Sequence, residues 1–304
     1  TAGDLWHYLS QASGTDVAAV ARSWTDQKGY PLLQARVTCE NGKQTLELEQ
    51  QRFSVDDAVD ATSLWQVPFA VSAGTAAPVH LLLAGRSATF AIGPCTTALL
   101  FVDSSAGFFR VQYPPEHLHR LTRAFPELSP SARLALLTDA FALGQAGRIP
   151  LAEYFALLSR LRPAGDPATL VLFLQADYAL SNLDGAMHGA PAQKSLHSYA
   201  RNKLGPMLRQ LGWSVSPSDT AVALSLRNDL IEVLGRFGDE ATLRKSMELF
   251  KAERNGGAAI APSIRPGVLA NVGRRADAEI FAELVKRMTT ATRVEDGWLY
   301  AEAL

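Results

Sequence analysis

The chain has 304 residues, of which 47% are hydrophobic and 19% charged, and its 29 basic and 30 acidic side chains leave a net charge of −1. This length suits roughly two domains of about 150 residues each. The near-neutral charge gives no reason to expect a nucleic acid or an anionic membrane surface as a partner. The longest apolar runs, such as residues 98–102, are far too short to span a bilayer.

The first thirty residues predict helices. Asp16 is a suitable N-cap for an apolar stripe that recurs at i, i+3, i+4 and i+7 and ends at Trp24. Gly29 and Pro31 then end the helical pattern. We expect Trp24 to pack against the domain that follows.

From about residue 32 to 113 the apolar period becomes two, which is typical of strands. Two alternating runs flank the pair Asn41-Gly42, a strong hairpin signal because both turn residues need a positive φ. Further strands are expected at residues 65–72, 79–84, 88–92 and 98–103. Six or seven short strands predict a small antiparallel sandwich or barrel.

From about residue 115 onward the strand pattern gives way to helical patterns. Ser129 and Pro130 suit the N-cap and first position of one helix, and Ser216 and Pro217 suit those of another. Roughly ten helices joined by short turns predict a stack of helical hairpins.

The sequence lacks the common catalytic motifs. It contains no H-E-x-x-H, C-x-x-C, G-x-S-x-G, P-loop or G-x-G-x-x-G. His117 and His119 lie at i, i+2 on different sides of a predicted helix, which favours a solvated helix start over a metal pair. Ser195 lies near His197, but no acid or oxyanion hole is positioned beside them. We therefore predict no catalytic and no metal-binding residue in this chain.

Two further groups of residues have structural explanations. Cys39 and Cys95 are too few for a disulfide scaffold, and we expect two buried thiols. The acidic run of Asp56, Asp57 and Asp60 lacks the Gly and Glu of a calcium loop, which favours an exposed connection.

Several segments in chain order resemble the aminopeptidase N family of zinc metallopeptidases. They are DLW at 4–6 with WTDQKGYP at 24–31, AGFFRVQY at 106–113, TDAFALG at 138–144 and, more weakly, LGW at 211–213 with LR at 226–227. The first two resemble the end of the family's thermolysin-like catalytic domain, the third its last sandwich strand, and the fourth the first helix of its helical domain. Thr138 and Gly144 depart from the family's Asp and Ala, and Ser181 stands near a frequent Trp.

The resemblance implies an α+β, multidomain chain. Residues 1–30 would be the terminal helices of a catalytic domain that is otherwise missing, and 31–113 a β-sandwich domain. Residues 114–304 would be an all-α superhelical domain of helical hairpins, similar to HEAT or armadillo repeats and truncated at its C-terminus. The family's zinc motif, exopeptidase loop and catalytic Tyr would lie upstream of Thr1, so none is assigned here. The resemblance thus implies that zinc belongs to the missing catalytic domain, that this segment binds no cofactor, and that it is inactive alone.

In the family the helical domain forms a bowl that encloses the substrate over the zinc site. The resemblance therefore implies the substrate-enclosing half of a zinc aminopeptidase, with peptide substrates and the missing catalytic domain as partners. A free-standing helical-repeat interaction module is one alternative, and a structural remnant of a parent that lost its zinc site is another. A soluble protein without nucleic-acid or membrane partners is expected, with the cytoplasm slightly favoured.

One arginine is a candidate for peptide binding. A peptide's free carboxylate must be paired when water is excluded. Arg265 lies between Ser263 and Pro266 at a predicted helix start, and helix starts in stacked hairpins often open toward one rim. We expect Arg265 to contact the peptide tail and Tyr178 to form an aromatic wall, while a solvated arginine that caps a turn is the alternative.

Overall fold

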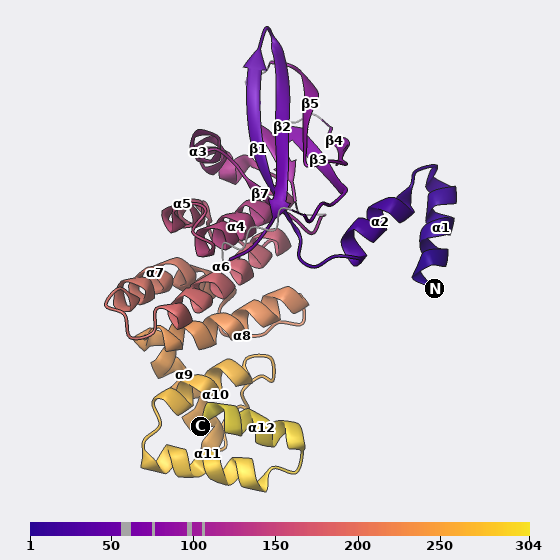
Figure 1. Cartoon of the computed structure of the whole chain (residues 1–304). Coiled ribbons are helices and arrows are strands. Elements are labelled where there is room, and N and C mark those ends of the chain that lie inside the picture. Colours follow the sequence, from indigo (N-terminus) through magenta and orange to yellow (C-terminus); the bar gives the residue numbers. More distant parts are fainter. Residues whose placement is uncertain (56–61, 75–76, 96–98, 105–106) are drawn as a thin grey trace. The chain divides into compact units, whose positions relative to one another are not determined.

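The computed structural model describes residues 1–55, 62–74, 77–95, 99–104 and 107–304 (Figure 1). The chain divides into two compact units, Thr1–Leu161 and Arg162–Leu304. This division does not test the domain boundaries after residues 30 and 113, which stay a prediction. Within the described ranges no helix is long and apolar enough to cross a membrane.

The first unit begins with helices α1 (Ala2–Ser13) and α2 (Val17–Thr25). The Asp16 side chain caps α2, as predicted, by accepting a hydrogen bond from a backbone N–H of its first turn. The half-buried Trp24 donates from its indole N–H to the carbonyl oxygen of Gln66 at 2.9 Å, and its ring lies 6.4 Å from that of Trp65. The expected contact of Trp24 with the β region is confirmed.

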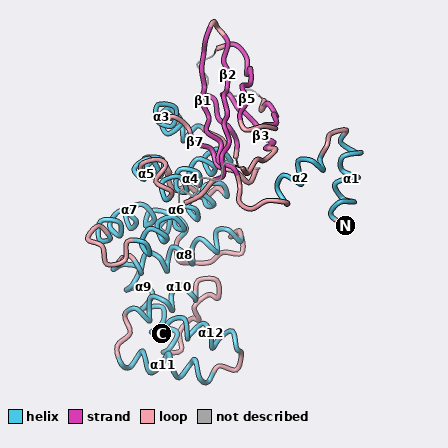
Figure 2. The backbone as a smooth tube through the Cα atoms, viewed as in Figure 1, coloured by secondary structure: helices cyan, strands magenta, loops and turns pink. Residues whose placement is uncertain are grey.

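The described part of the first unit contains seven strands, shown in magenta in Figure 2. They are β1 (Pro31–Glu40), β2 (Lys43–Arg52), β3 (Val67–Ala73), β4 (Val79–Leu83), β5 (Ser87–Pro94), β6 (Leu100–Asp103) and β7 (Arg110–Gln112). One sheet has the order β5-β2-β1-β7 and the other β4-β3-β6. The predicted hairpin is confirmed, since Asn41 and Gly42 have φ of 50° and 76° between β1 and β2. One detail differs from a purely antiparallel arrangement, because β7 pairs parallel with β1.

The two cysteines do not fit the sequence expectation. Cys39 near the end of β1 is exposed, Cys95 after β5 is half-buried, and the two form a disulfide. The prediction of two buried thiols is wrong, because strand pairing brings these positions together although 56 residues separate them in sequence. The acidic run at 56, 57 and 60 lies outside the described residues.

Three helices and a short 3-10 turn follow β7 in the first unit. They are α3 (Pro115–Ala124), η1 (Phe125–Glu127), α4 (Pro130–Gln145) and α5 (Leu151–Arg160). Ser129 caps α4 and Pro130 is its first residue, as predicted. A Cβ at Gly144 would lie 2.9 Å from the Leu151 side chain. Glycine at this position therefore lets α5 begin close to α4.

A buried carboxylate joins β7 to α4. Asp139, only 5% exposed, accepts hydrogen bonds from the Ser104 hydroxyl at 2.9 Å, the Val111 N–H at 3.1 Å and the Arg110 guanidinium at 3.2 Å. Burial raises the pKa of Asp139 to about 6, although Arg110 and the donors favour the charged form. The carboxyl group is therefore mainly ionised at neutral pH, and the segments 106–113 and 138–144 meet in one ion pair.

The histidines of α3 have different environments. His119 is exposed and lies 2.9 Å from a carboxylate oxygen of Glu153. His117 is buried, stacks on Tyr113, and its Nε2 lies 2.7 Å from the carbonyl oxygen of Leu100. Burial lowers the pKa of His117, so the neutral ring donates from Nε2 to this carbonyl. The predicted solvated helix start is wrong for His117, because the amphipathic helix turns that side chain toward the sheet.

The second unit consists of helices in two layers. They are α6 (Pro167–Ala186), α7 (Gln193–Leu211), α8 (Ala221–Arg236), α9 (Glu240–Arg254), α10 (Arg265–Arg274), α11 (Ala278–Thr290) and α12 (Val294–Ala303). Helix α8 packs on α6 and α10, and α10 packs on α12, which forms the even-numbered layer. Helices α7, α9 and α11 pack on α8, α10 and α12 and form the odd-numbered layer. The predicted fold class, small sheets followed by a helical domain, is confirmed.

Helix α8 begins later than the sequence predicts. Thr220 is its N-cap, accepting from a backbone N–H at 3.2 Å. Ser216 instead lies in the preceding turn, where its N–H donates to Asp219 at 2.8 Å. Asp219 in turn pairs at 3.0 Å with the buried Arg227, whose Nε donates to the carbonyl oxygen of Gly212. The turn thus supplies the carboxylate that pairs with Arg227. The weakly matching segments at 211–213 and 226–227 are in contact here.

Helices α8 and α10 approach each other closely at two glycines. A Cβ at Gly267 would lie 2.6 Å from the Asn228 carbonyl oxygen, and one at Gly235 would lie 1.8 Å from Oδ1 of Asn271. The N–H of Gly267 donates to Oδ1 of Asn228 at 2.9 Å. A side chain at either position would therefore separate the two helices.

We predict that Gly267→Ala lowers the free energy of unfolding by about 1–3 kcal/mol, because the methyl group has no room against backbone atoms. Gly185→Ala in α6 is the matched control, since no atom lies within 4 Å of its added Cβ, and it should raise stability by up to about 1 kcal/mol. Urea unfolding measures both. Equal effects of the two variants would contradict this packing of α8 on α10.

Candidate functional site

The even-numbered helices of the second unit share a stripe of polar side chains on their free face. On α8 the stripe follows the spacing i, i+3, i+7 through Asp229, Glu232 and Arg236. The Arg236 guanidinium donates to the Ser181 hydroxyl on α6 at 2.6 Å. The Arg274 guanidinium on α10 lies 3.5 Å from Glu232. The stripe is therefore continuous across α6, α8 and α10.

Burial and like charges alter the acidity of this stripe. Burial raises the pKa of Asp177 on α6 to about 7, and the negative charge of Asp229 adds to this shift. Burial also raises the pKa of Asp229. At neutral pH Asp177 is therefore partly protonated and can donate as well as accept a hydrogen bond. A face with such groups can bind backbone amides, carbonyls and cationic side chains.

A groove of about 500 Å³ lies at one end of this face, between α8, α10 and α12. Pro266 and Leu299 give it an apolar lining, and Glu232, Arg274 and Glu302 supply charged groups of both signs. Burial lowers the pKa of Arg274, although Glu232 favours its charged form. An apolar lining with a few charged groups suits a short extended chain with polar ends.

Tyr178 belongs to the same face. It is 59% exposed on α6 and lies one turn before Ser181, the residue that binds Arg236. The structure therefore brings Tyr178 together with the polar stripe. Its predicted contact with a peptide stays a prediction.

Arg265 is placed differently. It is the first residue of α10, as predicted, but its guanidinium binds both carboxylate oxygens of Glu253 on α9, at 2.6 and 3.1 Å. Glu253 also accepts from Arg287 on α11 at 3.1 Å. The Arg265 side chain is 21% exposed, so it joins helices of both layers and is not brought together with Tyr178. Sequence reasoning missed Glu253 and Arg287, because their pairing depends on the packing of three helices.

Of the pair Ser195 and His197, the histidine has an acidic partner. Nε2 of His197 lies 2.5 Å from Oδ1 of Asp184, so an acid is positioned beside this histidine, contrary to expectation. Gln193 donates to the same oxygen at 2.7 Å. Ser195, two residues before His197 on α7, lies on a different side of the helix. These contacts tie α7 to α6 and do not form a nucleophile–base pair.

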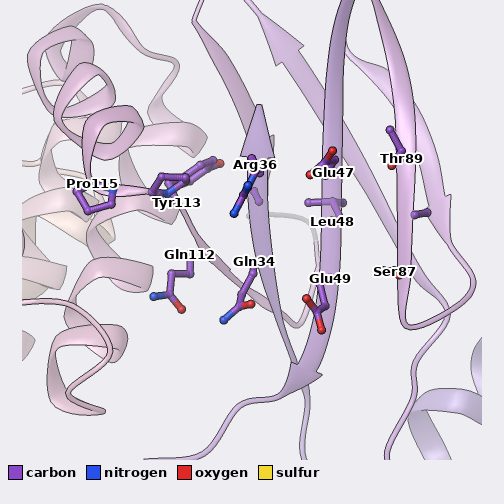
Figure 3. A pocket seen from close by; sticks show the side chains of 13 residues that line it. Gln34, Arg36, Glu47, Leu48, Glu49, Ser87, Thr89, Gln112, Tyr113 and Pro115 are labelled. Atoms are coloured by element: carbon purple, nitrogen blue, oxygen red, sulfur yellow. The ribbon is translucent and has the colours of Figure 1, made fainter. Parts of the chain in front are cut away.

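The outer face of the four-stranded sheet carries a second hollow, of about 480 Å³ (Figure 3). Strand register aligns Gln112, Gln34, Glu49 and Ser87 across β7, β1, β2 and β5. Figure 3 shows Arg36 and Glu47 beside this row and Tyr113 with Pro115 at the rim. The surface offers hydrogen-bond donors and acceptors on rigid strands but no nucleophile–base pair.

The described residues do not fit a catalytic zinc ion. Among them no three His, Cys, Asp or Glu side chains lie close enough to share a metal. A protein zinc site takes three or four such ligands. No step of a zinc mechanism can therefore be assigned to the side chains described in this chain.

Comparison with known proteins identifies a matching family model and several similar proteins. A family model described as "ERAP1-like C-terminal domain" matches residues 99–304. The puromycin-sensitive aminopeptidase of Caenorhabditis elegans is 28% identical over 95% of this chain and 31% of its own length. Aminopeptidase M1 of Arabidopsis thaliana is 28% identical over 90% of this chain and 33% of its own length. Aminopeptidase N of Lactococcus lactis subsp. cremoris is 28% identical over 94% of this chain and 33% of its own length. The chain thus spans about a third of the length of these relatives.

We predict that Arg265→Ala lowers the free energy of unfolding by about 1–3 kcal/mol, because it leaves the largely buried Glu253 with fewer donors. Arg275→Ala is the matched control, since Arg275 pairs with Glu240 at the surface, and it should cost less than about 1 kcal/mol. Chemical unfolding of both variants measures the difference. An Arg265→Ala chain as stable as wild type would show that this guanidinium has no structural role.

Proposed function

This chain belongs to the ERAP1-like C-terminal domain family, and from that membership we propose that it is the substrate-enclosing C-terminal portion of a zinc-dependent aminopeptidase that removes N-terminal residues from peptides. The match over residues 99–304 is the observation that carries the proposal. The names of the similar proteins, all aminopeptidases, support the same activity for the whole protein.

The proposed role of the second unit is to cover a bound peptide. A lid over a reaction site removes bulk water and keeps the substrate in register, which strengthens every polar contact within. The continuous face of α6, α8, α10 and α12 supports this role, because it presents polar side chains at several points along an extended chain. Layered helical hairpins hold such a face rigid.

We assign the peptide contacts to the even-numbered face. Tyr178 supplies an exposed aromatic ring, Asp177 and Asp229 supply acceptors, and Arg274 beside the groove supplies a cation for a carboxylate. The proposed contact of Arg265 with the peptide tail requires that the peptide's carboxylate replace Glu253, the present partner of that guanidinium.

The zinc chemistry is assigned to the part of the relatives that this chain does not cover. A zinc ion there would activate the water that attacks the peptide bond. The exposed Leu5, Tyr8 and Leu9 on α1 support a neighbouring protein surface on that side. The segment alone is proposed to bind no zinc and to be inactive.

We predict that an unstructured peptide of about ten residues shifts NMR signals of α6, α8, α10 and α12 at low salt. Tyr178→Ala should weaken binding about fivefold, which corresponds to the loss of about 1 kcal/mol of aromatic contact. Phe281→Ala is the matched control, because Phe281 is an exposed aromatic residue of α11, and it should leave the affinity unchanged. Signals that shift mainly on α7, α9 and α11 would contradict the assignment of the peptide contacts to the even-numbered face.

We also predict that the purified chain, after dialysis, contains less than stoichiometric zinc and cleaves no aminoacyl amide. Elemental analysis and a fluorogenic aminopeptidase substrate measure the two quantities. Amide cleavage that survives repurification and is abolished by a chelator would overturn the assignment of the chemistry to another part of the protein. A degenerate zinc motif in the sequence upstream of Thr1 would instead identify a remnant of a parent without activity.

A further inference from the structure

The Cys39–Cys95 disulfide joins positions that are not neighbours in the sheet. Cys39 lies near the end of β1 and Cys95 directly follows β5, while β2 runs between these strands. The two cysteines are the only ones in the sequence, and both are used in this bond. The Cα atoms of the two cysteines are 5.7 Å apart, and the N–H of Cys95 pairs with Gly42 in the turn before β2 begins. The disulfide therefore passes the end of β2 at the tip of the β1–β2 hairpin and ties the edge strand β5 to β1.

The crosslink is attached to β5 just beyond an irregularity in the strand. The pairing of β5 with β2 is regular from Ser87 to Ala91 and then shifts register between Gln44 and Thr45. Gly93 has a φ of 149° at this irregularity. Beyond it, the N–H of Cys95 donates to the carbonyl oxygen of Gly42 at 2.9 Å. The disulfide thus joins the end of β5 to β1 beyond the point where the ladder is interrupted.

We propose that this disulfide is a thiol-exchange site, attacked at Cys39 by a dithiol reductant, and that it is the staple that holds the end of β5 on the sheet. Cys39 is the more exposed of the two residues and Cys95 is half-buried, and the proposed attack is therefore at Cys39. Exchange depends on such access.

The exchange balances with one dithiol. Its thiolate attacks Sγ of Cys39, the S–S bond breaks, and Cys95 leaves as a thiolate that takes up a proton. The second thiol then attacks the mixed disulfide, releases Cys39 as a thiol and leaves the reductant oxidised to its own disulfide.

Reduction has a physical consequence for the sheet. The disulfide joins residues 56 apart in sequence, and such a crosslink restricts the unfolded chain. Strand β5 carries no charged side chain, and in the described structure it pairs on one side only, with β2. A loosened, uncharged edge strand can pair with another chain. The intact bond therefore protects the sandwich. Such bonds persist in oxidising compartments, so the proposed bond disfavours the cytoplasm, which was slightly favoured from the sequence.

The test uses the full chain before and after reduction with dithiothreitol. Alkylation and mass measurement should find no free thiol in the air-oxidised chain and two after reduction. Reduction should raise hydrogen exchange of residues 87–95 several-fold and lower Tm, while α7, α9 and α11 keep their exchange rates. The double variant Cys39→Ser/Cys95→Ser should resemble the reduced chain and be insensitive to dithiothreitol.

Two results would overturn the proposal. One is the presence of two free thiols in the air-oxidised chain. The other is equal exchange of residues 87–95 in the oxidised and reduced wild type, which would show that the bond does not hold β5. Because both states of the wild type are compared, this second reading does not depend on the folding of the double variant.

Discussion

The buried carboxylate of Asp139 connects the strands of the first unit with its helices. It accepts from Ser104 beside β6, from Arg110 and Val111 in β7, and it stands on α4. A buried charge is tolerated only when it is paired and hydrogen-bonded, and removing one partner of such a pair typically costs about 3–5 kcal/mol. The position of α4 on the sheets, and with it that of α5, which packs on α4, thus depends on one carboxyl group that all three donors share.

Segments that carry the family resemblance contact one another where parts of the fold that are distant in sequence pack together. Residues 106–113 and 138–144 meet in the pair of Arg110 and Asp139. The weaker pair of segments meets where the buried Arg227 binds the carbonyl oxygens at Leu211 and Gly212. These two pairs of segments couple residues that are distant in sequence but adjacent in the fold. The resemblance therefore reports a shared architecture, and the proposed function of the chain rests on that architecture and on the face it supports.

Local chemistry made the helices and strands predictable from the sequence. The contacts between side chains of different helices and strands were not predictable. The turn at Asn41-Gly42 and the caps at Asp16 and Ser129 follow from backbone geometry and nearby hydrogen bonds. The later start of α8 depends on Arg227, which draws Asp219 into the preceding turn. The disulfide depends on strand order, and the partners of Arg265 depend on helix packing. Of the candidate site, the helix start at Arg265 was predictable, but not the direction of its side chain.

Hydrogen exchange at the Val111 amide tests the central role of Asp139 most directly, because this N–H donates to the carboxylate itself. In Asp139→Ala the account predicts that this amide and its neighbours in β7 exchange at least about tenfold faster than in wild type. Glu116→Ala, which removes an exposed carboxylate of α3, should leave the rate unchanged. Equal protection of Val111 in Asp139→Ala and wild type would contradict the account, because the sheet and α4 would then hold together without the buried carboxylate.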